Sequence, residues 1–212
     1  RNESHLRIEM ANIYLKTDIN ISTELFYDIK DTYAICLNGH TITFTNENLK
    51  EWVKFSDSHA KLIITDCKKT GKITFDSSKS ALRYNIVKSG PYGGYVELSN
   101  IEFKDIKVRE PFFDISNLGI KDKFKTKNVK MNNVTVESGE KIGFINVHQH
   151  MGSKSINFMD GTAFNGFIRK LALGEGTSGV EPSISVNQVI EEIRFIDRKP
   201  TSDDGLIYYT ED

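Results

Sequence analysis

A short pattern of alternating residues recurs along most of the chain and constrains the fold more than any other feature. An apolar residue, any residue, a second apolar residue and one further residue are followed by Asp, Asn or another turn residue. Seven copies occur, the first two of them weaker, at 13–17, 35–39, 62–66, 101–105, 129–133, 156–160 and 193–197. Alternation at period two is typical of a strand with one buried face, and the closing residue supplies a bend. The repeated unit is therefore predicted to be a strand followed by a corner.

The spacing of these copies predicts a stacked solenoid. Four of the six intervals are 22 to 28 residues, which leaves room for two further short strands per repeat, and the two longer intervals are explained by loop insertions at 88–98 and 171–185. Short helical turns are expected only at 48–55 and 186–193. The chain has 24 Ile and 16 Asn but only 6 Ala, which favours strands and turns. Because one repeat cannot bury its apolar face alone, the copies must stack, and residues 1–212 are predicted to form a single domain.

Two segments resemble a known family. Leu37–Thr43 reads LNGHTIT and Leu62–Thr74 reads LIITDCKKTGKIT. Both resemble the first rungs of right-handed parallel β-helix proteins of the pectate-lyase-like superfamily, which includes bacterial surface proteins and polysaccharide-processing enzymes. The resemblance implies an all-β fold, a right-handed single-stranded parallel β-helix solenoid of about seven or eight rungs, with three parallel sheets and Asn ladders at one corner. It also implies an extracellular or cell-surface location, in a larger protein of which this chain is a fragment.

The catalytic signatures of that superfamily are only partly present. Its pectate lyases bind calcium with an acidic cluster and use an Arg as base, and its polygalacturonases combine Asp pairs with Gly-His-Gly and Arg-Ile-Lys. Here Ile168-Arg169-Lys170 has the residue types in a different order, and Gly-His-Gly does not occur. Asp160 and Asp197, with Arg169 nearby, remain the catalytic candidates. Stacked rungs would place these two carboxylates ~4.8 Å apart, a spacing that suits a retaining glycosidase or a shared calcium ion.

A structural role explains the same acidic residues more simply. Asp and Asn tolerate left-handed backbone and hydrogen-bond to their own backbone, so they are favoured at corners whatever the chemistry. Stacking would also bring Asp66 beside Asp105, whereas Asn133 and Gly39 fill the equivalent position without a charge. Enzymatic activity is therefore left open, and no cofactor is expected other than, at most, calcium.

The Gly-rich segment Gly90–Tyr95 is the best candidate for ligand binding. Two aromatic side chains, Tyr92 and Tyr95, can stack on sugar rings or contact a protein partner. The alternative is a tight turn in which both rings fold back over the end of a rung.

The charge balance and the hydropathy of the chain argue against nucleic acid and membrane as partners. With 28 basic and 29 acidic residues the net charge is −1, so no overall field attracts nucleic acid, and no apolar run is long enough to insert in a membrane.

The two cysteines are predicted to lie too far apart for a disulfide. Aligning the repeats offsets Cys36 from Cys67 by four residues along neighbouring strands. That offset is ~13 Å, beyond the ~7 Å limit between Cα atoms of a disulfide, so two free thiols are predicted.

These features favour a non-catalytic, adhesin-like module of the cell surface, a monomer that binds a polysaccharide or a host surface protein on an extended β-helix face. One alternative is a polysaccharide lyase or glycoside hydrolase acting on an anionic polysaccharide. The other is a purely structural surface stalk.

Overall fold

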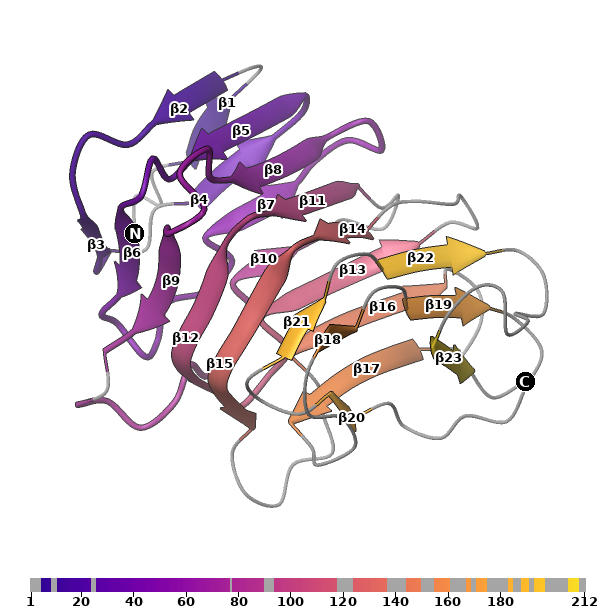
Figure 1. The fold of residues 1–212 in the computed structure, drawn as a ribbon. Helices are drawn as coiled ribbons and strands as arrows, with labels where there is room; N and C mark the ends of the chain where they lie inside the picture. Colours follow the sequence, from indigo (N-terminus) through magenta and orange to yellow (C-terminus); the bar gives the residue numbers. More distant parts are fainter. Residues whose placement is uncertain are drawn as a thin grey trace.

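The computed structural model describes residues 5–8, 11–23, 26–76, 78–89, 94–117, 124–136, 144–149, 155–160, 167–168, 171–174, 183–184, 188–190, 193–196 and 206–209. Their regular elements are all β-strands, which pair into three large sheets and one small one (Figure 1). Sheet I contains β2 (Ala11–Tyr14), β5 (Thr32–Cys36), β8 (Lys61–Thr65), β11 (Tyr95–Ser99) and β14 (Phe124–Lys127). Sheet II contains β3 (Ile19–Ile21), β6 (Thr41–Phe44), β9 (Lys72–Phe75), β12 (Glu102–Val108), β15 (Val129–Val136), β21 (Gln188–Ile190) and β18 (Phe167–Ile168).

The remaining strands form the third large sheet and the small one. Sheet III contains β1 (His5–Ile8), β4 (Phe26–Ile29), β7 (Val53–Phe55), β10 (Val87–Lys88), β13 (Phe113–Asn117), β16 (Ile145–Gln149), β17 (Ser155–Asp160) and β20 (Ser183–Ile184). The small sheet contains β22 (Ile193–Ile196), β19 (Leu171–Gly174) and β23 (Leu206–Tyr209).

From β2 to β16 the chain visits sheets I, II and III in turn, so every third strand returns to the same sheet. Neighbouring strands within each sheet are parallel over this stretch. The described residues therefore trace five successive rungs of three strands each, stacked on one another. Three strands per rung is the number expected from the spacing of the repeat.

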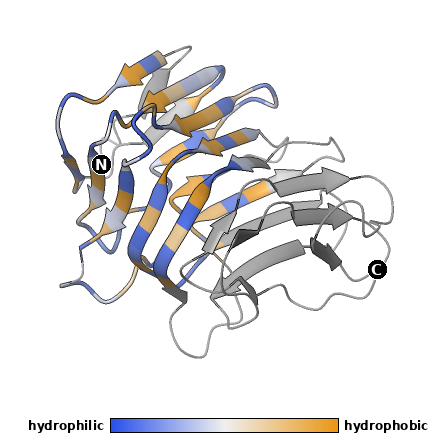
Figure 2. Cartoon of the chain, in the orientation of Figure 1, coloured by the Kyte–Doolittle hydropathy of each residue, from blue (hydrophilic) through white to orange (hydrophobic). Residues whose placement is uncertain are grey.

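Alternation of residues along each strand builds the core between the sheets. In β5, β8 and β11 every second side chain is buried, and Figure 2 shows the same alternation as coloured bands along β12 and β15. Parallel register stacks the buried residues into columns, one of which runs through Ile42, Ile73, Phe103 and Met131. Burying a large apolar side chain is worth roughly 1.5–3 kcal/mol, so such columns supply the main force that holds the rungs together.

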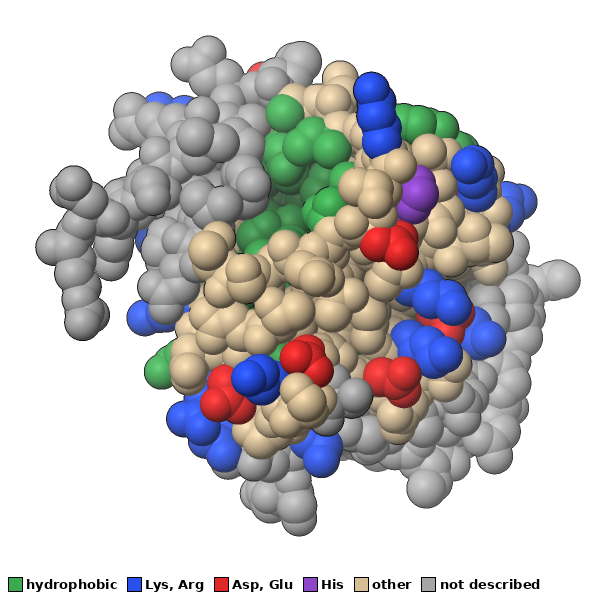
Figure 3. Space-filling view, turned by 90° about the vertical axis from the view of Figure 1, so that its left-hand side faces the viewer, with side chains coloured by type: hydrophobic (Ala, Val, Ile, Leu, Met, Phe, Trp, Pro, Cys, Tyr) green, Lys and Arg blue, Asp and Glu red, His purple; other side chains and the backbone are tan. Residues whose placement is uncertain are grey.

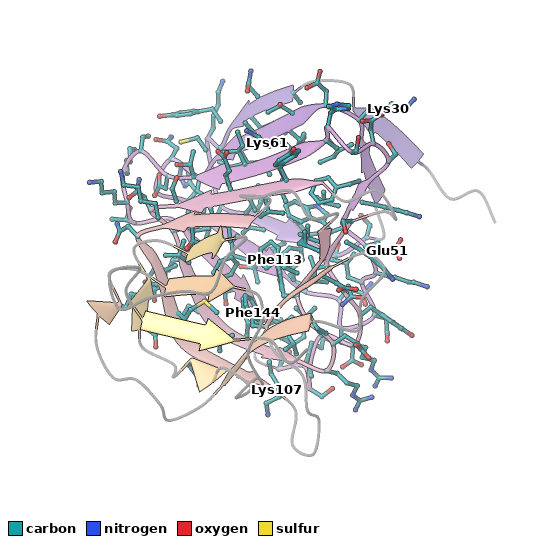
Figure 4. The ribbon with its side chains drawn as sticks, turned by 90° about the vertical axis from the view of Figure 1, so that its right-hand side faces the viewer. Lys30, Glu51, Lys61, Lys107, Phe113 and Phe144 are labelled. Carbon is teal, nitrogen blue, oxygen red and sulfur yellow. The ribbon has the colours of Figure 1, made fainter. Side chains whose placement is uncertain are left out.

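An aromatic cluster fills the interior beside sheets II and III. The ring of Phe112 lies 4.9 Å from that of Phe113, 5.1 Å from that of Phe144, 5.6 Å from that of Phe44 and 5.8 Å from that of Phe103, measured between centroids. Figure 4 shows Phe113 and Phe144 directed inward between the sheets. The pairs with Phe44 and Phe103 are edge-to-face, an arrangement that aromatic quadrupoles favour, and the pair with Phe144 is stacked.

The predicted corner at Asp66 follows β8, whereas the predicted corners at Asp105 and Asn133 lie inside β12 and β15, where both residues have left-handed backbone. Other residues that follow strands make hydrogen bonds to local backbone or to the next rung. Asp76 follows β9 and accepts the backbone N–H of Ser78. Asn100 and Asn128 have φ of 56° and 54° and stack, because the Asn128 side-chain amide donates to Asn100 Oδ1 at 3.0 Å. Asparagine accepts left-handed backbone at low cost, which explains why this residue type recurs at a corner.

The predicted register between rungs is wrong by two residues. The repeat alignment pairs Ile35 with Leu62, whereas in the structure Ile35 pairs with Ile64 and Leu62 pairs with Tyr33. A shift of two keeps the same side chains buried, since the strand period is two, so the burial pattern cannot detect the error.

The seven copies of the repeat also do not form one column. The first three fall in sheet I, whereas 101–105 and 129–133 fall in sheet II, 156–160 in sheet III and 193–197 at β22. Asp66 therefore does not lie beside Asp105, which pairs instead with Asn133 through a 2.8 Å side-chain hydrogen bond. The predicted helical turns are wrong as well, because 48–55 contains β7 and 186–193 contains β21.

After β16 the stack changes direction. Strand β17 pairs antiparallel with β16, and β21 pairs antiparallel with β15. The cycle of three strands continues, since β17, β18 and β19 pair in parallel with β20, β21 and β22 respectively. The repeat copy at 156–160 is thus a strand, as predicted, but of reversed direction.

Thr126 offers a test of packing in the core. It points inward beside Leu98, is 4% exposed, and its hydroxyl has no hydrogen-bond partner among the described residues. An unpaired buried hydroxyl is costly, so Thr126→Val, which keeps the shape, should raise the free energy of unfolding by about 1 kcal/mol in urea titrations. Thr65→Val is the matched control, because the Thr65 hydroxyl hydrogen-bonds to that of Ser99. A destabilised Thr126→Val protein would contradict this reading of the core.

Candidate functional site

The outward side chains of β5, β8 and β11 form a surface, called here the outer sheet face. Parallel register arranges them in three rows: Thr32, Lys61 and Tyr95; Ala34, Ile63 and Glu97; Cys36, Thr65 and Ser99. Because each strand contributes every second residue, the rows follow directly from the alternation that builds the core. Figure 4 shows Lys61 on this sheet, away from the core aromatics.

Lys61 contacts both Glu97 and Tyr95 on the outer sheet face. Its Nζ donates to Glu97 Oε1 at 3.1 Å and lies 5.9 Å from the centre of the Tyr95 ring. The Lys61 and Glu97 side chains are each 34% exposed, and Tyr95 is half-buried. An aromatic face, an ammonium and a carboxylate thus lie together at the surface. Such a trio can stack on one face of a sugar ring while its polar groups hydrogen-bond to hydroxyls.

The third row leads to a corner where several polar groups converge. Asp66 follows β8 directly and is fully buried. Its Oδ1 accepts backbone N–H groups from Gly39 at 3.0 Å and Lys68 at 3.1 Å, and its Oδ2 accepts those of Thr70 and Gly71. Gly39 belongs to the preceding rung, so this one carboxylate both closes its own turn and joins two rungs.

Four donated hydrogen bonds determine the charge state of Asp66. Burial alone would raise the pKa of this carboxyl, but the backbone N–H groups of Lys68, Gly71, Gly39 and Thr70 outweigh burial and hold the pKa below its usual value. The side chain is therefore a carboxylate at neutral pH, and its oxygens are already occupied.

Two thiols and a phenol lie next to this corner. The Cys36 Sγ is 3.6 Å from the Cys67 Sγ, and both cysteines are free. The Tyr14 hydroxyl donates to Asn38 Oδ1 at 2.6 Å. Partial burial raises the pKa of Tyr14, and charge on Cys67, Cys36 and Asp66 adds to the rise. Free thiols were predicted, but the ~13 Å separation behind that prediction is wrong, because the true register places Cys36 beside Thr65.

This corner does not have the chemistry of a calcium site. Among the residues that the structure describes, the one group of three potential metal ligands is Cys36, Asp66 and Cys67, whose ligand atoms lie within 4.8 Å of one another. Calcium prefers several oxygen ligands, whereas this group offers two thiols and a carboxylate with no spare acceptor. Calcium therefore stays a prediction without a located site.

The structure describes two of the five predicted site residues, Tyr95 and Asp160. Tyr95 begins β11 and contributes to the outer sheet face, whereas Tyr92 lies outside the described residues. Asp160 is the last residue of β17, and Asp197 and Arg169 lie outside the described residues. Strand β17 pairs with β16 and β20, and β22 pairs with β19. The described pairings therefore do not stack the two strands on which the Asp160–Asp197 pair was based.

A second cluster, at loops between strands, had no signal in the sequence. Lys50 Nζ lies 5.7 Å from the centre of the Tyr84 ring, which is 43% exposed. Next to Tyr84 in the chain, Arg83 places its Nη2 3.7 Å from Glu47 Oε1. The Ser80 hydroxyl donates a hydrogen bond to Glu47 Oε2 at 2.9 Å. Roughly one rung of sequence separates these partners, so only the three-dimensional structure brings them together.

An apolar hollow of about 230 Å³ lies at the β2 and β3 end of the stack. Ile13, Leu15, Ile19, Tyr33 and Trp52 contribute to its lining. Figure 3 shows hydrophobic side chains gathered on this side of the molecule. The hollow is the interior of the first rungs seen from their end, and it carries few polar groups that could orient a ligand.

Comparison of the chain with protein-family models, with curated proteins and with solved structures finds no match. Within the described ranges, no helix is long and apolar enough to cross a membrane.

Proposed function

We propose that this chain is a right-handed parallel β-helix of the pectate-lyase-like kind, with about seven or eight rungs, from a bacterial surface or secreted protein. The five rungs from β2 to β16 and the two further cycles from β17 to β22 support that number. Right-handedness follows the general rule for parallel crossovers. The proposed role is a non-catalytic, adhesin-like module, outside the cell, that binds a polysaccharide on the outer sheet face.

The observation that carries this proposal is the trio of Tyr95, Lys61 and Glu97. Aromatic rings supply stacking surface for the C–H face of a sugar. Lys61, which pairs with Tyr95 in the ladder, supplies a donor, and Glu97, two residues further along β11, supplies an acceptor. The parallel ladder holds all three at fixed spacing, so little ordering cost accompanies binding. An open sheet face suits an extended polymer chain better than a closed pocket does.

Glycan-array binding should test the proposal. Tyr95→Ala is expected to weaken binding to the glycan that the unmodified chain recognises about tenfold, because ~1.4 kcal/mol of stacking is lost. Tyr84→Ala is the matched control: this tyrosine also lies under a lysine and is exposed, but it is outside the outer sheet face. Equal binding by all three proteins would contradict the proposed site on the outer sheet face, and binding by none of them would favour a structural stalk.

The enzyme alternative is tested in parallel. The chain is incubated with anionic and neutral polysaccharides, with and without calcium, and new reducing ends and unsaturated sugars are measured. Product formation that disappears in Asp160→Asn or Asp197→Asn would replace the adhesin by a polysaccharide lyase or glycoside hydrolase. No product is expected.

A further inference from the structure

The pair Cys36 and Cys67 is the strongest feature that the proposed binding function does not use. Cys36 ends β5 and is half-buried, and Cys67 lies in the turn after β8 and is exposed. Their sulfur atoms are 3.6 Å apart. A disulfide has a sulfur–sulfur distance of ~2.05 Å, so a combined movement of roughly 1.6 Å would close the bond. Rotations about the two Cα–Cβ bonds produce movements of this size.

The backbone around both thiols is held by hydrogen bonds that do not involve the sulfurs. Cys36 pairs with Thr65 in the ladder, and the next N–H, that of Leu37, donates to the Thr65 carbonyl at 2.8 Å. The turn that carries Cys67 is fixed by the Asp66 carboxylate, which accepts N–H groups from both rungs. The fold therefore presents the two thiols to each other before any bond forms.

The environment favours sulfur–sulfur chemistry over metal binding. A structural zinc site needs four ligands, and the described neighbourhood offers two thiols plus Asp66. Each oxygen of Asp66 already accepts two backbone N–H groups, so the carboxylate would have to give up the turn in order to bind a metal.

We propose that Cys36 and Cys67 form a redox site that closes to an intramolecular disulfide by exchange with a low-molecular-weight disulfide such as oxidised glutathione. The Cys67 thiolate, the more exposed, attacks one sulfur of the glutathione disulfide, whose bond breaks and releases one glutathione thiolate. The Cys36 thiolate then attacks the Cys67 sulfur and releases the second. Two protein thiols lose two electrons and two protons, and one glutathione disulfide is reduced to two thiols.

Closure would tie neighbouring rungs together covalently. The bond would join β5 to the corner after β8 and close a loop of about 30 residues, which restricts the unfolded chain strongly. The equilibrium constant for disulfide formation is larger in the folded chain than in the unfolded chain by the same factor by which the disulfide raises the equilibrium constant for folding. The effect can therefore be measured either as a redox equilibrium or as a change in stability. The inference does not depend on the proposed polysaccharide binding.

The test equilibrates the full chain, with a metal chelator present, in buffers of graded oxidised-to-reduced glutathione ratio. Samples are quenched in acid, alkylated under denaturing conditions and analysed by intact mass and peptide mapping. The poise of the buffer is the concentration of oxidised glutathione divided by the square of the concentration of reduced glutathione. The folded chain should become half oxidised at a value of this quotient about 100-fold lower than the value needed for the same chain in concentrated guanidinium chloride. The product should be a monomer lighter by two hydrogens, with a Tm higher by ~10 °C.

A thiol moved by one residue supplies the matched control. The Lys68 side chain lies against Gly39, so a thiol at position 68 is expected to point there, and the double variant Cys67→Ser with Lys68→Cys should lose the 100-fold advantage of the folded state. Cys36→Ser should retain a mixed disulfide with glutathione at Cys67. The proposal is overturned if the folded chain carries only mixed disulfides, links two chains, or oxidises no more readily than the unfolded chain.

Discussion

Replacing Phe112 by Ala is expected to lower the free energy of unfolding by about 4 kcal/mol and to lower the Tm by roughly 10 °C. The ring is fully buried and contacts four other phenylalanine rings, from Phe44 on one side to Phe144 on the other. Its loss removes the transfer free energy of a large side chain and leaves a cavity at the point where several rungs meet. Denaturant unfolding followed by fluorescence or circular dichroism measures the change.

Tyr84→Ala is the control for the loss of an aromatic ring as such. Tyr84 is 43% exposed and lies beneath Lys50, so its removal should cost no more than ~1 kcal/mol. Phe112→Leu should fall between the two, because it fills part of the cavity. If Phe112→Ala and Tyr84→Ala had equal effects, the aromatic cluster would not be the centre of the core.

Replacing Asp66 by Ala should cost about 3 kcal/mol, the second largest effect that we expect. Four backbone N–H groups lose their acceptor at once, and that of Gly71, which is itself buried, has little access to water. Leaving buried donors unpaired is more costly than the net worth of the hydrogen bonds. Asp76→Ala is the control, since this residue also closes a turn after a strand, but among the described residues its carboxylate accepts only the backbone N–H and the hydroxyl of Ser78.

Asp66 should also give the protein part of its sensitivity to acid. The folded-state pKa of Asp66 is lower than that of an unfolded aspartate, about 3.9. The carboxylate's contribution to stability is therefore complete above about pH 4 and is lost as the pH falls through the folded-state pKa. Asp66→Asn should lose less stability than the unmodified chain between pH 5 and pH 2, measured by urea titration at each pH. Identical pH profiles would show that the Asp66 charge is not what holds the turn.

The general type of the fold could be predicted from the sequence because it depends on local patterns. Alternation at period two identifies the buried residues of β5 and β8, and an Asp after the alternating run identifies the corner at Asp66. The same signal fails at Asp105 and Asn133, which lie within β12 and β15. The register could not be predicted, because strands of all three sheets share the same short pattern. Ile63 and Glu102 occupy the same place in the motif although they belong to different sheets.

Helix and strand were confused where a short apolar run imitates helical spacing. Leu49, Trp52 and Val53 lie at positions i, i+3 and i+4, as on one face of a helix. All three are buried, but the structure places Leu49 in a turn and Val53 in a strand of sheet III. A rung has to turn and re-enter a sheet within a few residues, and this tertiary constraint overrides the local spacing.

The candidate site shows the same division between local and long-range information. Tyr95 was identifiable as an aromatic residue beside a Gly-rich segment, which is a local signal. Its partner Lys61 comes from the neighbouring strand β8, whereas Glu97 lies two residues further along β11 itself. The cysteine pair likewise depends on a register between strands, which the repeat misplaced by two residues. Contacts between rungs are the part of the structure that single-sequence patterns determine least.

The reversal of direction after β16 limits how the molecule can assemble. A stack of identical parallel rungs is a template that another chain could copy, rung upon rung, into a filament of unlimited length. Antiparallel ladders space their hydrogen bonds differently from parallel ones, so β17 on β16 and β21 on β15 interrupt that template in two of the three sheets. A second copy of the chain therefore cannot continue the parallel ladder directly from β15 or β16, and in these two sheets the parallel stack has a defined length.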